Sequence, residues 1–240
     1  MILISRSRFW IALPFFVALI HRSAASGASK AHSIAFGKWN TVQGRPVPAS
    51  DFRTGAADPR PLTLKIRPLL VDGRVKEFTL GPAHDVTDAL FVVRRAFRVN
   101  DSLPQEAASP PHWQWQRGGW LLADRVTGHV SAINLPEFDA VYSAASWYRD
   151  YAAYCGVSDD GKKIFAIVAQ IGRRRPALKK ALDGPVISES AAPDSACPAP
   201  TWQRSPARVT FEPASAPTQT FAVRGHSVDV IEEEDEEATK

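Results

Sequence analysis

The chain has 240 residues, with 29 lysines and arginines against 25 acidic residues and a formal net charge of +4. Hydrophobic residues make up 45% of it, which suffices for a packed core and excludes a wholly disordered protein. Its 19 prolines and 14 glycines favour short elements joined by turns over long helices.

The first 25 residues have the pattern of a secretory signal peptide. Arg6 and Arg8 precede an apolar run over 9–20, and small or polar residues follow up to Ala25. This run is too short to cross about 30 Å of hydrocarbon comfortably, so an uncleaved membrane anchor is the less favoured alternative. We therefore expect a secreted or periplasmic protein with no membrane span after cleavage.

The two ends of the chain carry net charges of opposite sign. Loss of residues 1–25 removes three arginines and no acid, so the formal net charge falls from +4 to +1. Residues 232–237 are all acidic, and we expect the tail 232–240 to be disordered because like charges repel and bury nothing. Export and a nearly neutral mature chain argue against a nucleic-acid partner.

Residues 26–61 are predicted to hold an N-terminal strand and a proline-rich loop. The strand is placed at 33–42, and 43–61 is interpreted as loop because prolines cannot donate to a sheet. The main β domain is expected over 62–231. It opens with a hairpin at 62–80, where Asp72-Gly73 favours a tight turn.

Further strands follow along the chain. Residues 90–99 are rich in valine and phenylalanine, which favours a strand over a helix. The remaining predicted strands are 112–117, 120–123 paired with 129–135, 151–157 paired with 163–170, and finally 207–212 with 220–230. Gly118-Gly119 is expected to be a break or a bulge. The segments 136–149, 173–180 and 185–200 are interpreted as connections.

These nine or ten strands predict an all-β, antiparallel sandwich or irregular barrel. The hairpin at 151–169 resembles a half-blade of a β-propeller, since a strand, an S-D-D-G-K turn and an apolar strand follow one another. The resemblance implies a partial propeller-like stack of sheets as the alternative fold. The sequence contains no convincing second copy of this unit, so the sandwich or barrel is preferred.

Two cysteines, Cys155 and Cys197, remain in the mature chain. An oxidising compartment predicts that they form a disulfide, and two buried free thiols are the alternative. Their spacing is not that of a zinc site, and none of the mature histidines forms an H-E-x-x-H motif. We therefore predict neither a metal nor another cofactor.

Aromatic residues provide the most specific functional signal. Exposed rings on a sheet can stack on sugar faces or hold an extended peptide, although core packing is the commoner role of such residues. The predicted ligand-binding residues are Trp113, Trp115, Trp147 and Tyr148, with Arg173, Arg174 and Arg175 as an electrostatic rim.

The pattern as a whole predicts a non-catalytic binding or structural protein of the cell envelope or exterior. Its partner would be a polysaccharide, a peptide or an envelope protein. The alternative is a secreted, glycosidase-like hydrolase using two of Asp124, Glu137 and Asp150, which requires carboxylates about 5 to 9.5 Å apart. A third hypothesis is an assembly factor that donates or accepts an edge strand.

Overall fold

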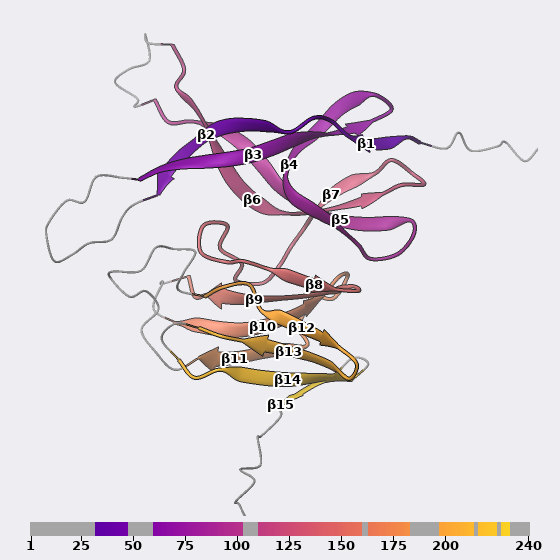
Figure 1. Cartoon of the computed structure of the whole chain (residues 1–240), viewed down its shortest axis with the longest axis vertical. Coiled ribbons are helices and arrows are strands. Elements are labelled where there is room, and N and C mark those ends of the chain that lie inside the picture. The colour runs from indigo at the N-terminus through magenta and orange to yellow at the C-terminus, as the bar shows by residue number, and fades with distance from the viewer. Residues whose placement is uncertain are drawn as a thin grey trace, which may run out of the picture. The chain divides into compact units, whose positions relative to one another are not determined.

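Fifteen β-strands make up the described part of the chain, which contains no helix (Figure 1). The structure, a computed structural model, describes residues 32–47, 60–102, 110–159, 163–182, 197–213, 216–224 and 227–230. All of these residues belong to one compact unit, Ala31–Lys240. The predicted all-β class is confirmed, with more strands than the nine or ten expected.

The first sheet has seven strands: β1 (Ile34–Phe36), β2 (Asn40–Val47), β3 (Arg60–Val71), β4 (Arg74–Asp85), β5 (Leu90–Asn100), β6 (Trp113–Asp124) and β7 (Val130–Ile133). Strands β2 to β6 form a closed ring, because β3 pairs with both β2 and β4 while β6 pairs with both β5 and β2. The β2–β6 pair, Gly44 with Trp115, is parallel, and the other pairs are antiparallel. The ring is a small irregular barrel.

Apolar side chains from all five ring strands meet in one cluster. Its members include Val42, Leu64, Leu80, Ala96 and Trp115. The alternation over 62–66 of β3 follows from this arrangement, because the side chains at 62, 64 and 66 pack in the cluster and those at 63 and 65 are exposed.

Two four-stranded antiparallel sheets follow, and each can be traced in Figure 1. The second sheet contains β8 (Ser146–Tyr148), β9 (Tyr151–Val157), β10 (Ile164–Gln170) and β11 (Leu178–Leu182). The third contains β12 (Thr201–Arg204), β13 (Ala207–Phe211), β14 (Gln219–Arg224) and β15 (Ser227–Val230). In both sheets, consecutive strands are neighbours.

The second sheet buries both of its faces. Ala153 and Cys155 pack in one cluster with Phe221 of the third sheet, which is the core of a sandwich. Tyr154 and the neighbouring Ala152 pack in another cluster with Val92 and Trp120 of the first sheet. Burial on both sides explains why β9 and β10 are almost continuously apolar instead of alternating.

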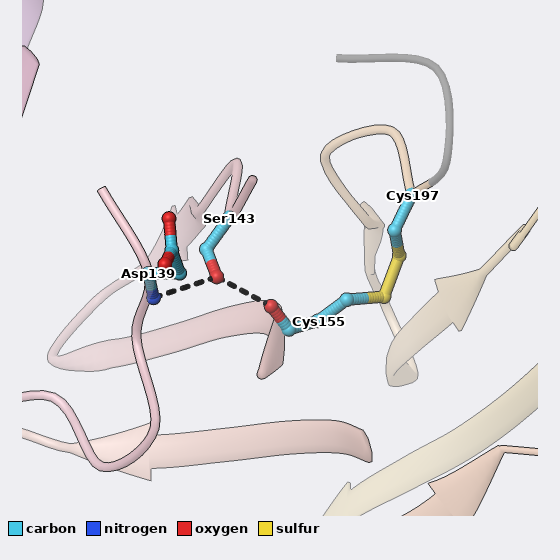
Figure 2. Close-up of a disulfide and its surroundings, with 4 residues drawn as sticks. All are labelled: Asp139, Ser143, Cys155 and Cys197. Atoms are coloured by element: carbon cyan, nitrogen blue, oxygen red, sulfur yellow. Dashed lines mark hydrogen bonds between the residues drawn. A yellow bond between two sulfur atoms is a disulfide. The ribbon is translucent and has the colours of Figure 1, made fainter. Parts of the chain in front are cut away.

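The predicted disulfide between Cys155 and Cys197 is confirmed (Figure 2). It joins β9 of the second sheet to the segment just before β12, with 6.2 Å between the two Cα atoms. Beside it, the buried Ser143 hydroxyl donates to the Cys155 carbonyl at 2.7 Å and accepts from the Asp139 N–H at 3.1 Å. These bonds fasten the 136–145 connection to β9.

Tyr154 fastens the same connection from the other face of β9. Its hydroxyl donates to the Pro136 carbonyl at 2.7 Å, and its ring meets Phe138 edge to face at 5.3 Å. Burial raises the pKa of Tyr154 well above its ordinary value, with a smaller contribution from Glu137. The hydroxyl therefore stays protonated and remains a donor.

Three segments predicted to be connections contain strands. Residues 43–47 belong to β2, whose pairing with β3 is interrupted between Gly44 and Val47, so the intervening Pro46 is not required to donate to the ladder. The 136–149 segment contains β8, and the basic segment and the residues after it contain β11. β11 is an edge strand, where exposed lysines discourage further pairing.

Three further boundaries differ from those predicted. The segment 33–42, predicted as one strand, is divided between β1 and β2. The 112–117 and 120–123 segments are one strand, β6, which continues through a register shift at Gly118-Gly119. The predicted strand 220–230 is divided into β14 and β15, which pair from Arg224 and Ser227 onward. The Asp72-Gly73 turn is confirmed, with φ of 51° and 77°.

The predicted signal peptide at 1–25, the predicted disordered tail at 232–240 and most of the predicted 185–200 connection lie outside the described residues. Among the residues that are described, no helix is long and apolar enough to cross a membrane.

Candidate functional site

Trp113, Trp115 and Arg98 come together at the paired ends of β5 and β6, and we call them the aromatic–arginine patch. The Trp113 side chain is 55% exposed, whereas Trp115 is half-buried against Phe78 at 4.9 Å, edge to face. The Arg98 guanidinium carbon lies 5.7 Å from the Trp113 ring centroid and 5.5 Å from that of Trp115. One exposed ring and one anchored ring therefore flank a cation.

The strand register creates this patch. Arg98 pairs across the ladder with Trp115, and Asn100 pairs with Trp113, so all four side chains belong to one face of the β5–β6 ribbon. Arg98 was not among the predicted site residues. Arg98 could have been predicted from the sequence, because an antiparallel pairing of the 90–99 strand with the 112–117 strand brings it opposite one of the tryptophans.

Hydrogen bonds fix the backbone just beyond Trp113. The Asn100 side-chain oxygen accepts from the His112 N–H at 2.9 Å, and the Asp101 N–H donates to the His112 carbonyl at 3.1 Å. The His112 ring also meets the Asp101 carboxylate at 2.7 Å. The backbone next to the exposed Trp113 indole is therefore fixed by hydrogen bonds.

Trp147 and Tyr148 lie elsewhere and point to opposite sides of β8. Trp147 packs edge to face on Trp120 at 5.2 Å and stacks near His84 at 6.2 Å. Tyr148 instead lies 5.4 Å from Trp202 of the third sheet. Both rings are half-buried and engaged in packing between sheets.

Arg173, Arg174 and Arg175 are exposed in the β10–β11 connection of the second sheet. The structure therefore distributes the predicted ligand residues over three places: the patch, β8 and this connection. The patch is the one that combines an exposed indole with a cation on a firmly paired strand.

Asp124, a carboxylate of the hydrolase hypothesis, is engaged in a turn. Its oxygens accept from the Val126 N–H at 2.7 Å and from the Thr127 hydroxyl at 2.8 Å. These hydrogen bonds, that of Thr127 first, lower the pKa of Asp124. The turn between β6 and β7 accounts for its position, as is usual for aspartate in turns.

Replacing Thr127 by valine is expected to raise the pKa of Asp124 toward the ordinary value of about 3.9, because this removes the hydrogen bond that lowers the pKa most. A lowered folded-state pKa means that this group stabilises the fold at neutral pH and that the contribution is lost as the pH falls below about 4. Carboxyl ¹³C NMR titration measures the shift. An unchanged Asp124 pKa would contradict the assignment, and Thr63→Val at an exposed strand position is the control.

Glu137 and Asp150 lie at opposite ends of β9. The Glu137 carbonyl accepts from the Val157 N–H at 3.0 Å, whereas Asp150 directly precedes Tyr151. A seven-residue strand is about 20 Å long, which is more than the carboxylate spacing of a glycosidase. Glu137 is paired with Lys179.

Asp150 lines a cavity of about 540 Å³ together with Val86, Thr87, Leu90, Leu122, Arg149 and Ile171. It is the single carboxylate among these lining residues, and it accepts from the Gln170 amide at 2.7 Å. The described residues also contain no group of three or more histidine, cysteine or acidic side chains arranged to hold a metal ion. The cavity lacks the second carboxylate that the hydrolase hypothesis requires.

Comparison of the chain with protein families, curated proteins and solved structures finds no match.

Proposed function

We propose that this chain is an exported, non-catalytic binding protein of the cell envelope or exterior, and that the aromatic–arginine patch binds polysaccharide. A sugar ring presents C–H groups on one face, which pack on an indole while its hydroxyls remain hydrated. An exposed tryptophan combines the large apolar area and the polar edge that such a contact uses.

The observation that carries the proposal is the 55% exposure of Trp113 beside an anchored neighbour. Leaving this much indole in water forgoes the stabilisation that burial would give. Trp115 packs against the apolar cluster inside the barrel, so the exposed Trp113 lies beside a well-packed neighbour. A ligand that covers Trp113 therefore gains apolar contact without having to order the protein first.

The covalent features of the chain support export. A disulfide joins its two cysteines, and such bonds persist mainly in oxidising compartments. Among the described residues, no helix is long and apolar enough to cross a membrane. This finding and the disulfide are compatible with an extracellular location. The predicted signal sequence points to the same location.

Replacing Trp113 by alanine is expected to weaken polysaccharide binding at least about tenfold, because truncating a tryptophan at the centre of an interface commonly costs 2 kcal/mol or more. The measurement is affinity electrophoresis of the folded protein through gels containing a panel of neutral and acidic polysaccharides. The free energy of unfolding should change by less than about 0.5 kcal/mol, since the ring is mostly exposed.

Trp39→Ala is the matched control, because Trp39 is 47% exposed and lies against Arg67 rather than Arg98. It should bind like the parent protein. If the parent is not retarded by any gel of the panel, or if both tryptophan variants are retarded as strongly as the parent, polysaccharide binding at this patch is wrong.

A further inference from the structure

Arg98 is a cation whose described contacts are the faces of two indoles. Two other arginines meet carboxylates: Arg95 of β5 lies 3.0 Å from Glu77, and Arg125, in the turn after β6, lies 2.6 Å from Asp85. Among the described residues no carboxylate is paired with Arg98, and its side chain is exposed. The patch therefore presents a positive charge that the described part of the chain does not neutralise.

The indole contacts leave the hydrogen-bonding capacity of Arg98 unused. A guanidinium carries five N–H donors in its own plane, and a ring face takes up none of them as a conventional acceptor. Two parallel N–H groups match the two oxygens of a carboxylate. Because Trp113 and Trp115 already flank the group, less side-chain freedom is lost when such a ligand binds.

A second positive charge belongs to the same face of the sheet. Phe78 pairs with Ala96 in the antiparallel pair of β4 and β5; Lys76 precedes Phe78 by two residues and Arg98 follows Ala96 by two residues. Side chains two residues apart on a strand share a face, and Lys76 is exposed. The face around the patch is therefore basic as well as aromatic.

We infer, resting on the polysaccharide binding proposed above, that the patch selects acidic polysaccharides and that Arg98 binds the carboxylate of a uronic acid residue. Trp113 covers the apolar face of that sugar or of its neighbour. One flanked guanidinium and one ammonium suit one planar carboxylate per sugar. Chains that carry several sulfates per sugar present more negative charges than these two cations can pair with.

Calorimetric titration of the folded protein with polygalacturonate and alginate, each beside its carboxyl-reduced counterpart, tests the inference. The acidic polymers should bind at least about tenfold more tightly than the reduced ones, the range of a hydrogen bond to a charged group. Arg98→Gln should remove this preference by weakening the acidic polymers alone. Arg98→Lys should retain only part of this preference, because the ammonium keeps the positive charge but cannot donate two parallel N–H bonds to a carboxylate.

Arg95→Gln is the matched control, since Arg95 is already paired with Glu77, and it should keep the preference of the parent protein. Equal binding of acidic and reduced polymers, with both weakened by Trp113→Ala, would overturn the role of Arg98 and leave polysaccharide binding intact. Binding of dextran sulfate without binding of either uronate would overturn the choice of carboxylate. Binding of none of these polymers would overturn the inference, while gel retardation by another polysaccharide would still support the proposed function.

Discussion

Replacing Cys155 and Cys197 together by alanine is expected to lower the free energy of unfolding by about 4 kcal/mol. The disulfide closes a loop with a sequence separation of 42 residues, and the chain-entropy estimate for a loop of that length is about 4 kcal/mol. Both half-cystines are also buried in the core between the second and third sheets. Urea denaturation of the parent and of the double variant, both without reductant, measures the difference.

A reduced sample of the parent protein separates the covalent link from the packing of the sulfur atoms. It should lose most of the same stability, because the chain contains only these two cysteines. If the double variant and the oxidised parent unfold within about 1 kcal/mol of each other, loop closure is not a main source of stability.

Replacing Phe221 by alanine is expected to destabilise the protein by about 3 to 5 kcal/mol, the usual cost of removing a buried phenylalanine. Phe221 is fully buried in the same core and meets Phe211 edge to face at 5.7 Å. Its strand also pairs with strands on both sides, so the surrounding backbone is poorly able to collapse into the cavity. Urea denaturation again gives the value.

Two comparisons make the Phe221 result specific. Phe221→Leu, which retains most of the apolar volume, should cost clearly less than alanine. Val126→Ala, at a position 59% exposed, should change stability by less than about 0.5 kcal/mol. A cost below about 1 kcal/mol for Phe221→Ala would show that the two sheets do not share the tightly packed core described above.

Local chemistry was sufficient to predict most of the paired strands. Asp72-Gly73 specifies a left-handed turn that few other residue pairs adopt, and the alternation beginning at Leu62 shows which face of β3 is buried. The missed strands β8, β11 and β12 are three to five residues long. Elements this short show little periodicity, and their pairing depends on a neighbouring strand.

Proline was a misleading signal in the 43–61 segment. A missing N–H excludes proline only where the ladder needs that donor, and the pairing of β2 is interrupted around Pro46. The interruption depends on how β2 meets β3, which no local pattern reports.

The sequence by itself determined the all-β class, the principal hairpins and the chemistry of the two cysteines, because these depend on neighbouring residues and on residue type. Only the tertiary structure decided which aromatic residues face solvent. Trp113 and Trp115 are two residues apart on β6 and therefore share a face of the strand. Phe78 from β4 nevertheless covers the Trp115 ring and leaves the Trp113 ring exposed. Burial is a property of long-range contacts, so the aromatic–arginine patch became visible only once β4, β5 and β6 were paired.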